Sequence, residues 1–282
     1  TKNIGVGGDP DDLDTQVLRA SLLTEFGDFR NTLIVDHLES DNNGFNISLK
    51  DVYYPSGINA LGLEEQINAE FAAQQARGVR TITSSMPQRE ENERLTIVNR
   101  TEYDFENGMQ LVNIFGYQET DLNYAPNIDG LPLLSSPVVK QGVIDSGLPE
   151  AWIDFVDTSL VKAVLIDQTK QTSNEIQLRG TFFDDRLDWI VGGFWLKSEP
   201  DGGGQINATT VFVTELGYTI PGLDPTTALV PDIGAQHLFI TDESKAVFAH
   251  FEYDLTESLG LEVGVRYTED EFEACIGTAA EG

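Results

Sequence analysis

The sequence has 282 residues and a formal net charge of −30, with 47 acidic and 17 basic side chains. A chain this acidic is a poor partner for nucleic acid or for an anionic membrane surface. It contains no stretch of about 18 consecutive apolar residues, the length that a transmembrane helix needs. This test does not exclude membrane-spanning β-strands, because their sequence signal is much weaker than that of a helix.

Four short polar turns punctuate the chain, and an alternating segment flanks each turn on both sides. This pattern predicts four β-hairpins, or about eight strands. The turns are Gly27-Asp28, Glu106-Asn107-Gly108, Asp184-Asp185-Arg186 and Thr256-Glu257-Ser258.

The first two hairpins have strands whose limits can be predicted from where the alternation begins and ends. These strands are Thr15–Phe26 with Phe29–Glu39, and Glu93–Phe105 with Met109–Asp121.

The third and fourth hairpins, within Gln171–Trp195 and Glu243–Asp270, alternate most clearly. A period of two places one set of side chains on each face of a sheet. One face is apolar and the other carries charge, as expected for a strand between lipid and a watery lumen. The predicted lumen-facing residues are Glu175, Gln177, Arg179, Glu252, Glu262 and Arg266.

Aromatic residues lie near both ends of these strands, where a membrane barrel carries its interfacial girdles. An alternative is the core of a soluble β-sandwich, and Ile190, Phe194 and Leu196, apolar residues on the face opposite Trp189, keep it open. The predicted membrane-interface aromatics are Phe182, Trp189, Trp195, Phe251, Tyr253 and Tyr267.

Long connections, Ser40–Asn92, Leu122–Lys170 and Pro200–Asp242, separate the hairpins and are predicted to be irregular extracellular loops. Within the first, the segment Leu61–Gly78 predicts a short amphipathic helix. The third contains Gly202–Gly204 followed by Pro221, Pro225 and Pro231, which predicts a mobile surface loop.

No catalytic set, cofactor motif or metal site is predicted. His37, His237 and His250 lack the spacing of a zinc motif, and His250 alternates with Glu252 and Asp254 as a solvated lining residue would. Asp9–Asp14 clusters carboxylates but does not follow the ligand order of an EF-hand. The single cysteine, Cys275, excludes an intrachain disulfide.

Three segments resemble the barrel hairpins of TonB-dependent outer-membrane receptors: residues 109–133, 173–195 and 243–271. Tyr117, Asp129 and Gly130 match in the first, and Arg266-Tyr267-Thr268 in the last is the most specific match. The chain starts at Thr1 without a methionine or signal sequence and stops at Gly282 just after an expected strand, so we expect an internal fragment.

The resemblance implies a barrel of about 22 strands preceded by a plug. Residues 1–282 would then be a partial barrel domain: about eight strands of an all-β, antiparallel, up-and-down transmembrane barrel with long extracellular loops, lacking the plug, the TonB box and the C-terminal strands. The resemblance also implies a bacterial outer-membrane location and no catalysis. The implied partners are outer-membrane lipid, TonB through the missing N-terminal region, and a small molecule such as a ferric siderophore, a corrinoid or an oligosaccharide.

Two other readings remain open at this point. A passive porin would have the same strands without a plug before them. A secreted β-sandwich binding module would fold in water without detergent.

Overall fold

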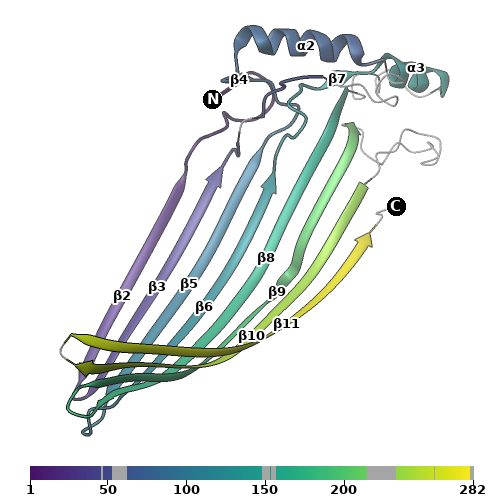
Figure 1. The fold of residues 1–282 in the computed structure, drawn as a ribbon. Helices are drawn as coiled ribbons and strands as arrows, with labels where there is room; N and C mark the ends of the chain where they lie inside the picture. The colour runs from purple at the N-terminus through teal and green to yellow at the C-terminus, as the bar shows by residue number, and fades with distance from the viewer. Residues whose placement is uncertain are drawn as a thin grey trace.

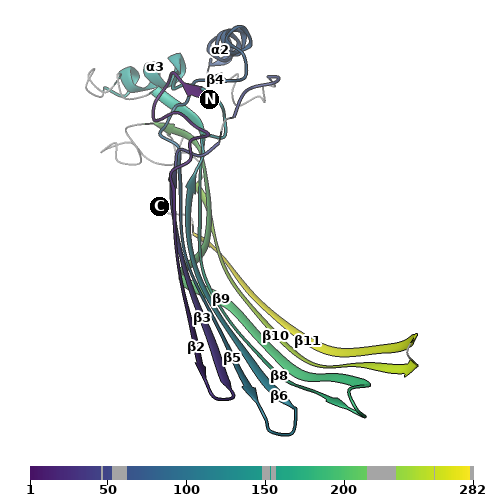
Figure 2. The ribbon, with the colours of Figure 1, turned by 90° about the vertical axis from the view of Figure 1, so that its left-hand side faces the viewer.

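The computed structural model describes residues 1–45, 47–52, 62–147, 153, 157–214, 233–256 and 258–279. It is dominated by one antiparallel sheet whose eight long strands lie in chain order, with the short strand β7 (Leu134–Ser135) added beside β8. The sheet curves strongly and does not close on itself (Figure 1, Figure 2). The predicted antiparallel barrel segment of about eight strands is confirmed.

The long strands are β2 (Thr15–Phe26), β3 (Phe29–Asn42), β5 (Arg89–Asp104), β6 (Gln110–Ala125), β8 (Asp157–Phe182), β9 (Leu187–Thr214), β10 (Ile233–Thr256) and β11 (Leu259–Ala279).

The predicted turns join neighbouring strands at one end of the sheet. Gly27 and Gly108 have φ of +57° and +79°, in the left-handed region that glycine adopts most easily. At the third turn, Phe183, Asp184 and Asp185 all have positive φ, and Thr181 Oγ1 donates a hydrogen bond to Asp185 Oδ1 at 2.8 Å. Glu257 of the fourth turn lies outside the described residues, and Thr256 pairs with Leu259 across it.

All three predicted irregular connections were partly wrong, since β3 runs to Asn42 and β5 begins at Arg89 within the first of them. β8 already begins at Asp157, β9 continues to Thr214, and β10 begins at Ile233. These extensions lack a period of two, yet the backbone ladder continues through them. The alternation signal needs two different environments, whereas ladder hydrogen bonds form with any non-proline residue.

The glycine run Gly202–Gly204 lies within β9 as a bulge, not in a loop as predicted. Five residue steps of β9, from Pro200 to Gln205, face two steps of β8, from Asp167 to Thr169. Gly202 and Gly204 have φ of +55° and +67°, and Gln168 Oε1 accepts a hydrogen bond from the Gly203 N–H at 3.0 Å. The prolines that were expected to continue this loop, Pro221, Pro225 and Pro231, lie outside the described residues.

A small cap of helices and short strands covers the end of the sheet opposite the short turns (Figure 1). It contains α2 (Glu64–Arg77), α3 (Pro137–Asp145) and a parallel pair, β1 (Lys2–Asn3) with β4 (Thr81–Ile82). Its apolar core consists of Leu63, Ile67, Leu131 and Leu134. The amphipathic helix predicted within Leu61–Gly78 is confirmed.

Buried polar side chains join this cap to the strands. The Asn127 amide donates to Ser84 Oγ at 2.8 Å, and the Ser85 and Ser159 hydroxyls lie 2.8 Å apart. Ser159 belongs to β8, so the network fastens the loop segments onto the long sheet. Buried polar groups need such partners to offset their lost hydration.

Tyr124, at the loop end of β6, gives a prediction for stability at high pH. Its ring stacks on Phe45 with 5.6 Å between centroids, and its buried hydroxyl has no hydrogen-bond partner among the described residues. Burial, with Glu90 nearby, raises the pKa of Tyr124 to about 12 from an ordinary value of 10.0. The folded state therefore favours the neutral phenol.

We expect this contribution to the free energy of unfolding to be complete below pH 10 and to be lost as the pH rises from about 10 to about 12. The free energy of unfolding in urea is measured across this pH range for the wild type and for Tyr124→Phe. The contribution of the Tyr124 hydroxyl is the difference between the two curves of free energy against pH. The variant should be at least as stable as the wild type at pH 7, because the buried hydroxyl has no hydrogen bond to lose and has lost its hydration. A difference curve that is flat above pH 10 would contradict the assignment.

Candidate functional site

The pairing register sorts the strand residues onto two faces, because directly opposed residues of a ladder point to the same side. One row runs from Gln177 through Gly192 and Phe248 to Arg266. Glu175 and Arg179 flank Gln177 two residues away on β8, and Glu252 lies opposite Glu262 on the same side of β10 and β11. We call this the polar face, defined by the six predicted lumen residues: Glu175, Gln177, Arg179, Glu252, Glu262 and Arg266.

An arginine network that the sequence did not predict lies on the polar face. Its centre is Glu102 of β5, whose side chain is only 11% exposed. Arg100 Nη2 lies 2.8 Å and Arg179 Nη2 3.5 Å from Glu102 Oε1, and Arg30 Nη1 lies 4.0 Å from Oε2. Arg179 Nε also donates to Gln110 Oε1 at 2.6 Å. The five side chains come from β3, β5, β6 and β8, so the network depends on strand order.

Two phenylalanines that interrupt the polar face are covered by an arginine. The Arg266 guanidinium lies 5.5 Å from the centroid of Phe194 and 5.8 Å from that of Phe248. Its Nε donates to Thr268 Oγ1 at 3.1 Å. A cation over aromatic rings is a favourable arrangement that places charge at the surface and apolar rings below it. Of the apolar residues that break the alternation in β9, Phe194 therefore has a local cover that needs no second sheet.

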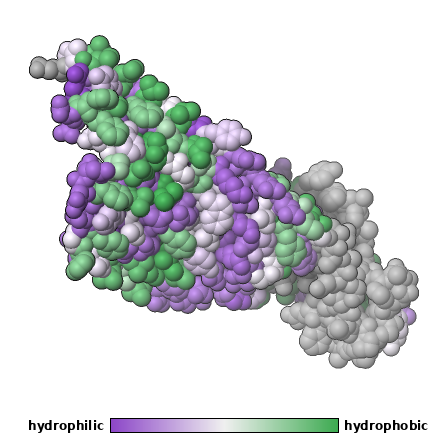
Figure 3. Space-filling view, turned by 90° about the horizontal axis from the view of Figure 1, so that it is seen from below, coloured by the Kyte–Doolittle hydropathy of each residue, from purple (hydrophilic) through white to green (hydrophobic). Residues whose placement is uncertain are grey.

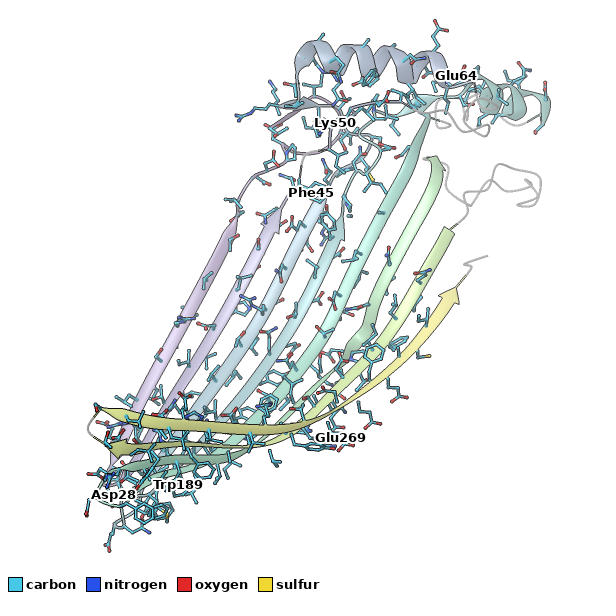
Figure 4. All side chains as sticks on the ribbon, in the orientation of Figure 1. Asp28, Phe45, Lys50, Glu64, Trp189 and Glu269 are labelled. Carbon is cyan, nitrogen blue, oxygen red and sulfur yellow. The ribbon has the colours of Figure 1, made fainter. Side chains whose placement is uncertain are left out.

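The opposite face, which we call the apolar face, carries all six predicted interface aromatics. One row across it runs from Gly180 through Trp189 and Phe251 to Val263. Phe182 stacks on Trp189 at 5.5 Å with an interplanar angle of 10°, and Figure 4 shows Trp189 toward the short-turn end of the sheet. The aromatics of this face are Phe182, Trp189, Trp195, Phe251, Tyr253 and Tyr267.

Much of the apolar face is exposed, although Trp189 is only 8% exposed. Val263, Val265 and Ile176 are 52%, 65% and 49% exposed, and the described ranges place no second sheet over them. A sandwich would bury these side chains. Figure 3, viewed from the short-turn side, shows hydrophobic side chains gathered in patches beside hydrophilic ones. A shallow apolar groove of about 450 Å³ crosses the face between Ile176, Val191 and Val247.

Charged side chains bound the apolar face on its loop side. Along β11, alternate residues are apolar from Leu259 to Tyr267, and the next two on this face are Glu269 and Glu271. On neighbouring strands, Trp195 Nε1 donates to Glu243 Oε1 at 2.9 Å, and Lys245 Nζ pairs with the same oxygen at 2.7 Å. The alternating segment Leu259–Tyr267 is nine residues long. A tilted strand needs about 9–11 residues to cross a bilayer, so the segment has the length of one crossing.

The histidines lie apart from one another. His37 Nε2 is 3.0 Å from one carboxylate, Glu93, on the apolar side of β3 and β5. His250 lies on the polar face near Glu252 and Glu262, and His237 lies toward the loop end of β10. No helix in the described ranges has the length and apolar character to cross a membrane.

No known protein family and no curated protein matches the sequence. The structure is similar to the ferric yersiniabactin uptake receptor FyuA from Yersinia pestis, with a TM-score of 0.57 and 10% identity. The alignment covers 99% of this chain and 35% of that receptor, so this chain spans about a third of its length. The siderophore receptor PiuA from Acinetobacter baumannii aligns with a TM-score of 0.49 and 14% identity over 98% of this chain and 38% of that one. The resemblance expected from the sequence holds at the level of the fold: the chain has the fold of part of a β-barrel receptor.

Proposed function

We propose that this chain is part of an outer-membrane receptor barrel that takes up a scarce small molecule, such as a ferric siderophore. The observation that carries the proposal is the two-sided sheet. Within the described residues no second sheet covers its apolar face, which is about one bilayer crossing long and edged by aromatics, whereas its other face carries paired charges. Outer-membrane lipid would contact the first face and a watery lumen the second.

In this proposal the polar face lines the substrate's route. Glu175, Gln177 and Arg179 offer alternating donors and acceptors along β8, and Arg266 presents charge above Phe194 and Phe248. These polar side chains would replace the water around a polar solute without binding it tightly, because each of them already has a neighbouring hydrogen-bond partner on the sheet. The residues would act in solvation and transfer, not in catalysis.

The cap with α2 and α3 would face outside the cell, and the short turns would face the periplasm. The cap is held by its own apolar core and by Asn127, so its surface can present fixed side chains to an incoming molecule. Energy would come from the inner membrane through TonB, acting on a plug region outside this chain. A corrinoid or an oligosaccharide is an alternative substrate class.

The location of the two faces can be tested by cysteine labelling in the whole protein. Cys275 is the single thiol of this chain and is exposed, so it must first be replaced by serine. In that background Glu175→Cys and Ile176→Cys place a thiol on adjacent residues of opposite faces. A membrane-impermeant maleimide should label the first in outer-membrane fragments, and a lipid-soluble maleimide should label the second. Equal labelling of both by the impermeant reagent would contradict the proposal.

Uptake itself can be tested by deleting the gene and restoring it in the native host. The deletion strain should lose growth on one class of ferric siderophore under iron limitation, and a protonophore should block accumulation of the labelled complex in the restored strain. Steady channel conductance of the purified protein in a planar bilayer would instead support a passive porin. Stable monomeric folding in buffer without detergent would support a secreted sandwich.

A further inference from the structure

His250 is placed between two carboxylates on the polar face near the short-turn end. Its Nε2 lies 2.9 Å from Glu252 Oε1 and 3.6 Å from Glu262 Oε1. One donor atom from each of the three side chains can be chosen so that all three lie within 4.8 Å of one another. His250 and Glu252 share β10, and Glu262 reaches them from β11. The sequence did not predict a metal site here, because one donor comes from the neighbouring strand.

The donor set and its spacing suit a transition metal. Imidazole nitrogen with carboxylate oxygen is a common zinc environment, with bonds of about 2.0–2.2 Å. Two tetrahedral ligands at that distance are about 3.3 Å apart. The observed Nε2–Oε1 separations of 2.9 Å and 3.6 Å lie on either side of this value. Side-chain rotations that also bring the two carboxylates, which lie within 4.8 Å of each other, to this spacing would complete the geometry.

The backbone register leaves room for the imidazole. Gly264 lies directly opposite His250, and a Cβ at that position would lie 3.3 Å from His250 Nδ1. A larger residue at 264 would crowd the ring from the side of β11. The glycine thus lets the imidazole lie close to Glu262, two residues away on the same strand.

The local charge also favours a cation. Asp188, Glu252 and Glu262 lie in one row across β9, β10 and β11, and like charges directly opposite each other destabilise a ladder. Within the described ranges no lysine or arginine forms an ion pair with Glu252 or Glu262. Arg266, the next basic residue on β11, stacks on Phe194 and Phe248 instead.

We propose that His250, Glu252 and Glu262 bind a divalent transition metal ion of the zinc type, with its remaining coordination positions open to the polar face. This goes beyond the uptake proposal and does not depend on which nutrient is carried. A bound ion would bridge β10 and β11 and would offset the facing carboxylates.

The test is zinc binding to the whole protein, purified in detergent without a polyhistidine tag and stripped with a chelator. Isothermal titration with Zn²⁺ should show one saturable site, and Co²⁺ should give the visible absorption of a nitrogen- and oxygen-ligated ion. His250→Ala and Glu262→Gln should each weaken Zn²⁺ binding at least tenfold. His37→Ala is the matched control, since His37 contacts a single carboxylate, and it should bind as the wild type does.

Two results would overturn the proposal: a wild-type protein that does not bind Zn²⁺, or a His250→Ala variant with unchanged affinity. Unchanged thermal unfolding of the stripped variants separates a lost ligand from a lost fold. As a measurement that needs no variant, crystals of the zinc-soaked wild type should show a zinc-edge anomalous peak between β10 and β11. Failure of the uptake test would leave this binding unchanged, so the two proposals can fail separately.

Discussion

Replacing Leu178 with arginine should destabilise the protein by about 2–4 kcal/mol in lipid, the cost of a cationic side chain near the middle of a barrel's lipid face. Leu178 lies on the apolar face of β8, midway between Phe182 at the short-turn end and Asn174, which pairs with Trp195. The adjacent Gln177 points to the polar face. Gln177→Arg at nearly the same depth should stay within about 0.5 kcal/mol of the wild type.

The measurement is urea unfolding of the whole protein refolded into phospholipid vesicles, followed by tryptophan fluorescence. The pair is informative because both variants introduce the same side chain and add one positive charge, one residue apart. If the protein were a soluble sandwich, its urea unfolding could be measured in detergent-free buffer, and the variant with arginine on the core-facing side of the sheet would be the destabilised one. Similar losses for both variants in vesicles would mean that lipid does not contact the apolar face, and the uptake proposal would lose its main support.

The predictions that held concern local signals. The strand expected at Thr15–Phe26 has those limits in the structure. The turn at Gly27-Asp28 fixes the register of this hairpin, and the alternation that leads up to the turn depends only on residues close in sequence. Which candidate residues share a face could also be predicted, since alternation along a strand follows from backbone geometry alone. Which face meets lipid and which lines a lumen stays a prediction. Helix α2 followed from apolar spacing and a stop at Gly78, whose φ is +82°.

The features that were missed depend on non-local pairing or on weak local signals. The outer halves of β8 and β9 are strands because each supplies a partner for the other, although neither alternates. The bulge of β9 at Gly202–Gly204 consists of glycines, a composition that is typical of a loop. Helix α3 was missed although Ser136 caps it and Pro137 begins it, which are recognisable start signals.

The contacts at the site were missed for a similar reason. Glu102 is bound by arginines from three strands, and which arginines reach it depends on the order β3-β5-β6-β8 and on the register between them. Glu262 meets His250 only because β10 and β11 pair with Glu252 opposite Glu262. Histidine spacing within a strand cannot reveal a donor set that is completed across the ladder.

Two neighbouring glycines of β9 should respond to alanine in opposite directions. Gly192 lies on the polar face, where a Cβ would lie 2.4 Å from Phe248 Cζ and 2.8 Å from the Ile176 carbonyl oxygen. The ring would have to leave its position beside Arg266, and the carbonyl is fixed by the ladder. Such overpacking costs about 1–3 kcal/mol. Gly193 lies on the apolar face, where the nearest atom to a new Cβ is 3.8 Å away.

We therefore expect Gly192→Ala to lower the free energy of unfolding by about 1–3 kcal/mol. Gly193→Ala should raise it by about 0.5–1 kcal/mol, because alanine loses less backbone entropy than glycine when a strand forms. Urea unfolding in vesicles measures both. Adding Phe248→Leu to Gly192→Ala should recover part of the loss, since it removes the nearer of the two clashes and leaves the one with the backbone. Equal stability of the two single variants would show that Phe248 does not pack over Gly192, and the row from Gln177 to Arg266 that defines the polar face would have to be redrawn.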